Sequence, residues 1–532
     1  MTHLSMGALG KSLSLLLNFI LVSAWSPSLV FAMVEGIVLV LRVRASSIPW
    51  KLLAACLCVL TAVGACAYLV VPNLQDYAEV GVASVSALVL KGWPMYPPPD
   101  AIHRYIVAYG PLTFTSRIPA FWAFGPTLFA FKLTGVLAFF TSMAGIYRVC
   151  RHYATPNVSL MGLGCCCLAF FRFVPVPYWG RGDPFILCMI VLCIWAILEA
   201  PRTVVLLAAA LTFALLPNIK ITAGCYLFPI VWFLIIGKGW KLAAGAVALG
   251  VLMFSLPFFS PQVSVANYWF SLNNSRHPIR IDILCRNVQY SIILLLPLLS
   301  MVRYRAKAGL SLSNDQKVYL ALTLCTIATA CLVGSNAGSG PHHLVPCIVP
   351  VLHLYFWLRS EIQPDVSVWA SSKLAVACTV SMFVFGAVNV LVFVSTLRHA
   401  FPGPEAIAEI RRVEIAHPRV PVQVGIGSDF NDFRTFYGAL TTLDGNPYTI
   451  GGLAVQELQV AGHQIPESTI QYIGRCGTPV WLIPKGDAPF SASDAYFPPD
   501  YPAFSQRFRE VFLENYKIIG SGPLYDIWAC SH

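Results

Sequence analysis

Two carboxylic acids lie close together in the first long polar stretch of the chain. Asp76 and Glu79 belong to the segment PNLQDYAE (72–79), and an apolar run that ends at Lys91 follows it. A spacing of three places both side chains on one face of a helix, where an ionised carboxylate can serve as a general base. The same segment also fits a capped helix start, with Asn73 as N-cap and Asp76 in the first turn. A cap and a catalytic role can coexist.

Cationic and imidazole side chains recur in later polar segments, where they could hold an anion. The candidates are Lys220, Arg276, Arg280, Arg286, His342 and His343. Arginine binds phosphate through paired donors, and an ammonium acts as a point charge. Adjacent histidines point apart on a helix, so we expect at most one of His342 and His343 in a site. Lys220 fits equally a pair with Asp183 or a side chain that snorkels to a membrane interface.

Stiff aromatic segments accompany these charges. Tyr96 lies in WPMYPPP (93–99), Tyr109 precedes Gly-Pro, and Arg181 and Asp183 belong to RGDP (181–184). Rigid loops with aromatic rings suit a sugar face or a lipid headgroup. For individual rings, an interfacial aromatic belt explains the pattern as well.

The elements that must position these residues are membrane helices. Of 532 residues, 57% are apolar and 11% are charged, whereas a soluble chain is roughly a quarter charged. The net charge of +11 is dispersed over short loops, which argues against a nucleic-acid partner. Lipid must therefore surround much of the chain.

The apolar runs predict about 12–13 spans, since a span needs roughly 17–25 apolar residues. The runs are Lys51–Val71, Thr127–Tyr147, Asn157–Phe173, Pro184–Leu198, Thr203–Leu216, Ile221–Ile236, Lys241–Phe259, Tyr290–Val302, Lys317–Gly334, Leu344–Leu358 and Lys373–Leu397. An earlier run, Ser12–Leu41, reads as one kinked span or a hairpin, and the orientation of the N-terminus stays open.

Alternate loops differ in charge, and this fixes the expected orientation. The short basic loops carry Arg42, Arg44, Arg148, Arg151, Arg202, Lys238, Lys241, Arg303, Arg305, Lys307 and Arg359. Such loops face the cytoplasm. The longer loops, including 72–126, then face outward, and so does the tail that follows residue 397.

The tail, 398–532, regains Gly, Pro and charged residues and predicts a small extracytoplasmic α/β domain after a membrane domain of 1–397. We expect strands at Val420–Ile426, Pro479–Ile483 and Tyr516–Gly520, and helices at Pro404–Ile415 and Tyr501–Asn515. If the tail is extracytoplasmic, Cys476 and Cys530 can form a disulfide. The fold class is thus mainly α, with a polytopic membrane bundle.

The order and sidedness of these motifs resemble the C-type glycosyltransferase superfamily, the membrane enzymes that use polyprenyl-phosphate sugars. The similarity is to its protein-mannosyltransferase and aminoarabinose-transferase branch. It rests on the acidic pair, GWPMY (92–96), YGPL (109–112), RGDP (181–184), Lys220 and YDIW (525–528). The chain departs from the usual acidic pattern, because two residues rather than none or one separate Asp76 from Glu79.

The resemblance implies sugar transfer, with inversion, from a polyprenyl phosphate to a hydroxyl of a lipid, glycan or protein at the outer face of a bacterial-type plasma membrane. Asp76 would be the base, and the cations would hold the phosphate. Some relatives use a divalent ion, so Asp76, Glu79 and Asp183 are candidate ligands for Mg²⁺, Mn²⁺ or Ca²⁺. The sequence names neither the sugar nor the acceptor.

Other functions remain open at this point. An oligosaccharide ligase that acts on polyprenyl diphosphates would use the arginine-rich segment and His342. A transporter of lipids or small solutes would explain the apolar bulk, although an acidic outer helix and a folded outer domain are not expected of it. Walker, zinc and dinucleotide-binding motifs are missing from the sequence.

Overall fold

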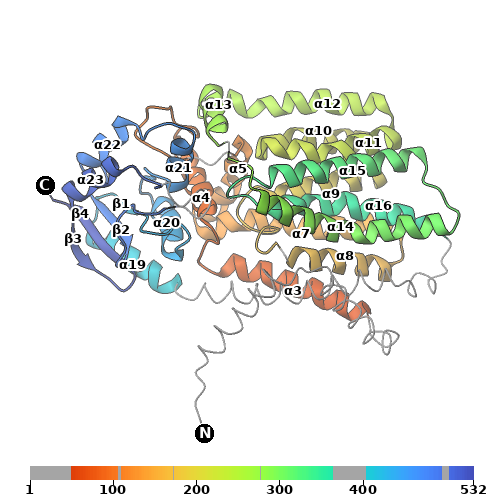
Figure 1. The fold of residues 1–532 in the computed structure, drawn as a ribbon, viewed down its shortest axis with the longest axis horizontal. Helices are drawn as coiled ribbons and strands as arrows, with labels where there is room; N and C mark the ends of the chain where they lie inside the picture. The colour runs from red at the N-terminus through yellow and green to blue at the C-terminus, as the bar shows by residue number, and fades with distance from the viewer. Residues whose placement is uncertain are drawn as a thin grey trace, which may run out of the picture.

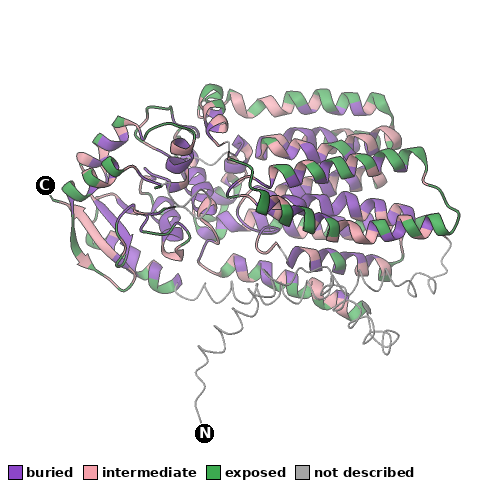
Figure 2. Cartoon of the chain, viewed as in Figure 1, coloured by how far each residue is buried: buried purple, intermediate pink, exposed green. Residues whose placement is uncertain are grey.

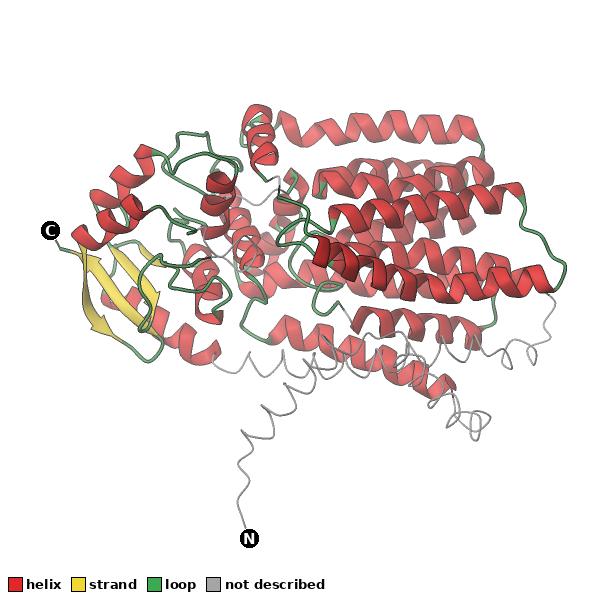
Figure 3. Cartoon of the chain, viewed as in Figure 1, coloured by secondary structure: helices red, strands yellow, loops and turns green. Residues whose placement is uncertain are grey.

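The chain forms a long helical bundle with a small mixed domain at one end (Figure 1). The structure is a computed structural model that describes residues 50–105, 109–171, 173–275, 277–362, 403–493 and 502–531. The predicted runs Ser12–Leu41 and Lys373–Leu397 lie outside these residues. Helices dominate the bundle and the strands belong to the C-terminal end of the chain (Figure 3).

The bundle is built from helices that run roughly side by side. They are α3 (Trp50–Val70), α7 (Leu128–Tyr153), α8 (Pro156–Phe171), α9 (Asp183–Glu199), α10 (Arg202–Ile219), η1 (Ile221–Tyr226), α11 (Leu227–Lys238), α12 (Trp240–Ser255), η2 (Leu256–Phe259), α14 (Ile281–Lys307), α15 (Asn314–Val333), η3 (Pro341–Cys347) and α16 (Ile348–Ser360). Every predicted run within the described residues coincides with helix. The boundaries differ most at α14, which begins at Ile281 rather than Tyr290, because its first two turns are polar and escape a search for apolar runs.

Seven helices of the described chain are long and apolar enough to cross a membrane. Their outer surfaces confirm the lipid environment. On α12, Val247, Val251 and Leu252 are exposed, as are Val59 and Val63 on α3. Figure 2 shows such exposed faces along α12 and α14. Contiguous apolar surface on this scale would be costly in water. The chain is therefore an integral membrane protein.

Short helices build the polar segments at the end of the bundle that faces the mixed domain. They are α4 (Tyr77–Leu90), α5 (Pro111–Thr115) and α6 (Ile118–Phe124) in the first long loop, and α13 (Val265–Asn274) in a later one. Almost the whole of α4 is buried. It packs between the bundle and the mixed domain, which explains why its sequence is apolar on every side.

The C-terminal domain is a four-stranded sheet with the order β1-β2-β4-β3. Its elements are α19 (Gly403–Ala416), β1 (Val422–Val424), η4 (Phe433–Tyr437), α20 (Gly438–Leu443), α21 (Gly452–Val460), α22 (Glu467–Gly474), β2 (Val480–Pro484), α23 (Gln506–Asn515), β3 (Tyr516–Ser521) and β4 (Tyr525–Cys530). Strands β1 and β2 are parallel, whereas β4 is antiparallel to both of its neighbours.

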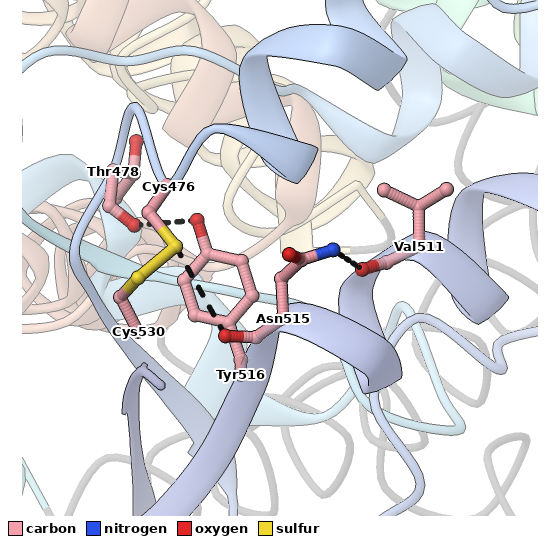
Figure 4. Close-up of a disulfide and its surroundings, with 6 residues drawn as sticks. All are labelled: Cys476, Thr478, Val511, Asn515, Tyr516 and Cys530. Atoms are coloured by element: carbon pink, nitrogen blue, oxygen red, sulfur yellow. Dashed lines mark hydrogen bonds between the residues drawn. A yellow bond between two sulfur atoms is a disulfide. The ribbon is translucent and has the colours of Figure 1, made fainter. Parts of the chain in front are cut away.

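Each predicted strand and helix of this domain overlaps an observed one. Strand β1 and helix α23 are shorter than predicted, α19 and β3 are longer, and β2 is shifted by one residue. The structure adds β4, which covers the YDIW motif, and the short helices η4 and α20 to α22. A disulfide joins Cys476 to Cys530 and ties the loop before β2 to the end of β4 (Figure 4).

The C-terminal domain is fastened to the first long loop. Arg104 exchanges backbone hydrogen bonds with Thr449 and Gly451, both at 2.7 Å. The hydroxyl of Tyr77 accepts a hydrogen bond from the Gly452 amide at 2.8 Å. These contacts place residues 72–105 and the C-terminal domain at the same end of the bundle, as the alternating loops require.

Candidate active site

Asp76 caps the N-terminus of α4. Its Oδ1 accepts a hydrogen bond from the Glu79 amide at 2.7 Å, and its backbone is extended as an N-cap requires. The alternative cap, Asn73, is therefore wrong. The other oxygen, Oδ2, accepts a hydrogen bond from Arg181 at 2.7 Å. The side chain of Asp76 is still 28% exposed, so a reacting group can approach it.

Glu79 has a different environment, although it lies one turn away. It is completely buried. Its carboxylate accepts hydrogen bonds from the Tyr68 hydroxyl, the Gly180 amide at 2.7 Å and the Gln75 amide at 2.6 Å. This network ties α3, the start of α4 and the segment before α9 together. Glu79 thus holds Asp76 and Arg181 in place, and its own oxygens are occupied.

Arg181 forms the link between the acid and the rest of the site. Its guanidinium packs over the ring of Trp179 at 4.1 Å and near that of Tyr109 at 5.6 Å. Burial by itself would lower the pKa of Arg181, but Tyr109, Asp76 and Asp183 outweigh it and raise that pKa. Arg181 is therefore a fixed positive charge beside the exposed edge of Asp76.

A buried arginine outside the predicted site residues supports this arrangement. Arg117 donates hydrogen bonds to the carbonyls of Gly180 and Arg181, both at 2.7 Å, and packs over Phe185. A Cβ on Gly180 would lie 2.0 Å from the Phe131 ring, so only glycine fits there. The available signal was weak, since Arg117 is a lone cation between two short apolar stretches.

Lys220 follows α10 and approaches the same region. The carbonyl of Ile219 accepts hydrogen bonds from the Gly110 amide at 3.0 Å and the Thr113 hydroxyl at 2.8 Å. A Cβ on Gly110 would meet the Asn218 carbonyl oxygen at 2.0 Å, which explains why the YGPL motif carries glycine there. The motif thus fixes the position of the backbone at the end of α10, and with it the position of the Lys220 backbone.

Both histidines of the pair lie in this cluster, contrary to the expectation of one. Nε2 of His343 lies 3.2 Å from Nζ of Lys220 and 2.9 Å from the Ser339 hydroxyl. The ring of His342 is 6.1 Å from that of Trp179 and 4.6 Å from that of His343. The pair lies in the 3₁₀ turn η3 and not in an α-helix, so the rule for α-helical neighbours does not apply.

Asp183 and Trp179 complete the cluster. The indole Nε1 of Trp179 donates to Asp183 at 3.0 Å, and Asp183 interacts electrostatically with Lys220, Arg181 and His342. Asp183, one of the alternative partners for Lys220, therefore interacts with it electrostatically, whereas the direct contact of the Lys220 ammonium is with His343. Trp179 contacts Arg181 on one side and His342 on the other, which makes the two halves of the site continuous.

The side chains of Arg280, Arg286 and Tyr96 make other contacts. Arg280 and Arg286 are 42% and 59% exposed, and both pair with Asp282 at the start of α14. Arg276 lies outside the described residues. Tyr96 is buried, and its hydroxyl donates to the Tyr109 carbonyl at 2.7 Å, so it supports the loop.

Asp76, Glu79 and Asp183 do not belong to a common group of three or more metal ligands among the described residues. No group of three or more His, Cys, Asp and Glu in the described part of the chain could hold a metal ion. Arg181 already supplies a positive charge to Asp76, and Glu79 is saturated by its donors. We therefore assign no chemical step to a metal.

An apolar hollow opens beside the histidine pair, between α8, α14 and the start of α16. It is lined by Leu168, Phe173, Tyr290, Leu294, Leu344 and Ile348. Leu344 directly follows His343 in the chain.

Comparison with known proteins gives a match in structure alone. No family model matches the sequence, and no curated protein is detectably similar to it. The fold is similar to the crystal structure of ArnT from Cupriavidus metallidurans bound to undecaprenyl phosphate, with a TM-score of 0.53 and 11% identity. The apo state of the same protein gives a TM-score of 0.51 and 10% identity. Each alignment covers 90% of this chain and 97% of that one.

At this level of identity the similarity concerns architecture. It extends over the bundle, the first long loop and the C-terminal domain, since nearly all of both chains is aligned. The fold that the short motifs of the sequence predict is thereby confirmed: the chain has the architecture of ArnT.

Proposed function

We propose that the chain is a membrane glycosyltransferase that moves a sugar from a polyprenyl phosphate to an acceptor hydroxyl. One observation carries the proposal: the accessible carboxylate of Asp76 lies at one edge of a buried cluster of basic side chains. That cluster consists of Arg181, Lys220, His342 and His343. The undecaprenyl phosphate bound to ArnT, which shares the fold, supports the same donor class.

The chemistry divides between the two ends of this site. Asp76 accepts the proton of the acceptor hydroxyl as its oxygen attacks the anomeric carbon of the donor sugar. The bond between that carbon and the phosphate oxygen breaks, and the electron pair leaves with the polyprenyl phosphate. Attack from the face opposite the phosphate inverts the anomeric centre.

The cations act on the leaving phosphate. Its negative charge grows as the bond breaks, and fixed positive charges in a buried site stabilise that change without reorganisation. Arg181 is fixed by Asp76, Trp179 and Tyr109, and Lys220 by the end of α10. No acid is needed for departure, because a phosphate monoester is already a good leaving group.

We place the start of the polyprenyl chain at the apolar hollow that is lined by Leu344, the residue after His343. The sidedness follows from the loop charges and the disulfide. Basic loops mark the cytoplasmic end, and Cys476–Cys530 suits an oxidising compartment. We therefore place the site and the C-terminal domain on the extracytoplasmic side. Of the residues that the ligase alternative would use, Arg280 and Arg286 are exposed and paired with Asp282, whereas His342 lies in the cluster.

The test is binding of undecaprenyl phosphate to the purified full-length protein in detergent. Lys220→Ala removes a charged partner of the phosphate, which is worth about 1.5–3 kcal/mol, so Kd should rise roughly 10- to 150-fold. Lys241→Ala removes an exposed lysine at the other end of the bundle and should leave Kd unchanged. Equal binding by Lys220→Ala and wild type, or no binding by wild type, would refute the proposed donor site.

A further inference from the structure

A polar cleft lies between the first long loop and the C-terminal domain. Its volume is about 600 Å³, which is within the usual range of small-molecule sites, roughly 300–1,000 Å³. One wall is the segment 73–75, and the other is the segment 429–436 together with Leu524. Gln75 immediately precedes Asp76 in the chain, so this wall ends one residue before the proposed base.

The inner wall contains a hydrogen-bond acceptor without a partner. The side chain of Asn73 is in a residue that is only 4% exposed, and its Oδ1 has no hydrogen-bond donor within the described structure. A buried polar atom of this kind is costly unless a ligand or water satisfies it. A hydroxyl group that enters the cleft would supply the missing donor.

The charge of the opposite wall selects against anions. Arg434 is the cation among the residues that line the cleft, and all of its guanidinium nitrogens are engaged. It bonds Asp432 through Nε and Nη2, and Nη1 donates to the Lys485 carbonyl at 3.1 Å. Asp432, and Asp487 at 3.9 Å, neutralise its charge. Asp429 adds an exposed carboxylate, so the lining is rich in acceptors and poor in free positive charge.

Two aromatic rings border the same space. Phe433 and Phe436 lie in η4, and Phe436 is largely buried whereas Phe433 is half-buried. Apolar ring faces beside hydrogen-bond acceptors match the two surfaces of a sugar, whose C–H groups and hydroxyls alternate. A phosphorylated headgroup would instead require unpaired Arg or Lys side chains.

We propose that this cleft binds the acceptor and that the acceptor is an uncharged glycan. The inference rests on the proposed function and adds the acceptor class to it. Asn73 accepts a sugar hydroxyl, the rings of η4 pack against the sugar, and a second hydroxyl at the end of the bound residue reaches Asp76. The C-terminal domain is then half of the acceptor site.

The experiment uses the full-length protein in detergent on an array of neutral oligosaccharides and their phosphorylated counterparts. Neutral glycans should bind, and Asn73→Ala should weaken that binding about tenfold, the effect of one lost hydrogen bond. Asn157→Ala, which alters an exposed asparagine at the opposite end of the bundle, should have no effect. Preference for phosphorylated glycans, unchanged binding by Asn73→Ala, or no glycan binding would overturn the inference.

A second variant tests the charge argument by gain of binding. Asp432→Asn keeps a side chain that can cap η4 but releases Arg434. It should acquire affinity for phosphorylated glycans, and its failure to do so contradicts the role given to the Arg434–Asp432 pair.

Undecaprenyl phosphate binding is measured on each preparation. If wild type binds neutral glycans but not this lipid, the donor proposal fails while the cleft stands. The reverse result refutes the cleft alone.

Discussion

Replacement of Glu79 by glutamine separates the two acidic residues by role. Glu79 accepts hydrogen bonds from Tyr68 and Gly180 through Oε1 and from Gln75 through Oε2. The single oxygen of a glutamine can replace either Oε1 or Oε2. The NH₂ group of the glutamine then takes the place of the other oxygen, where it faces a hydrogen-bond donor. We therefore expect Glu79→Gln to lose one charge-assisted hydrogen bond and to leave one buried donor without an acceptor.

The size of the effect follows from that geometry. A lost hydrogen bond to a charged group costs about 1.5–3 kcal/mol. If all of it appeared in the transition state, turnover would fall by one to two decades, since each decade is about 1.36 kcal/mol. Part of the cost instead lowers the stability of the fold. Glu79→Gln should therefore lose activity by no more than about a hundredfold and melt at a lower temperature than wild type.

The assay is release of undecaprenyl phosphate from its mannosyl, glucosyl and aminoarabinosyl derivatives, with membrane glycans as acceptor, at a series of pH values. Because Asp76 remains, Glu79→Gln should keep the acid limb of the wild-type pH profile. A loss of activity beyond about 10³-fold together with a flat acid limb would identify Glu79 as the base and refute the positioning role.

Three further outcomes are expected. Arg181→Lys keeps the charge but loses the planar contact with Trp179, worth up to about 2 kcal/mol, so the same assay should show turnover roughly tenfold lower; wild-type turnover would remove Arg181 from the site. Cys476→Ser with Cys530→Ser opens a loop of 54 residues and should lower the unfolding free energy of the C-terminal domain by about 3–4 kcal/mol, measured by urea-dependent proteolysis; an unchanged profile contradicts this. Burial and Asp444 raise the pKa of Glu414 to about 7, above its unfolded value of about 4.3, so the folded domain binds the extra proton and loses stability as pH rises from about 5 to 8. Glu414→Gln should remove that part of the pH dependence of the melting temperature, and an identical dependence would refute it.

The membrane architecture was accessible from the sequence because its physical cause is local. A run such as Lys241–Phe259 is apolar on all sides, and no tertiary contact can change its preference for lipid. The start of α14 could not be predicted from apolar runs, because Asp282 and Arg286 make its first turns polar. Strand β4 was not predicted, because its pairing with β2 and β3 is a tertiary property that the YDIW segment does not reveal.

The site shows the same division. Asp76 and Lys220 could be found because a charge beside an apolar run is conspicuous. The different environments of Asp76 and Glu79 could not be predicted from the sequence. They depend on hydrogen bonds that Glu79 accepts from Tyr68 and Gly180, which are distant in the chain. Arg117 was missed since its partners are backbone carbonyls, which leave no trace in the sequence.

The central claim is that Asp76 removes the acceptor proton beside a phosphate held by cations. The most direct measurement compares turnover and undecaprenyl phosphate affinity in Asp76→Asn and wild type. Asparagine keeps the cap on α4 but loses the oxygen that accepts from Arg181. The fold should therefore persist and the lipid should still bind, while turnover falls about 10²- to 10⁴-fold. Wild-type turnover in Asp76→Asn would contradict the account.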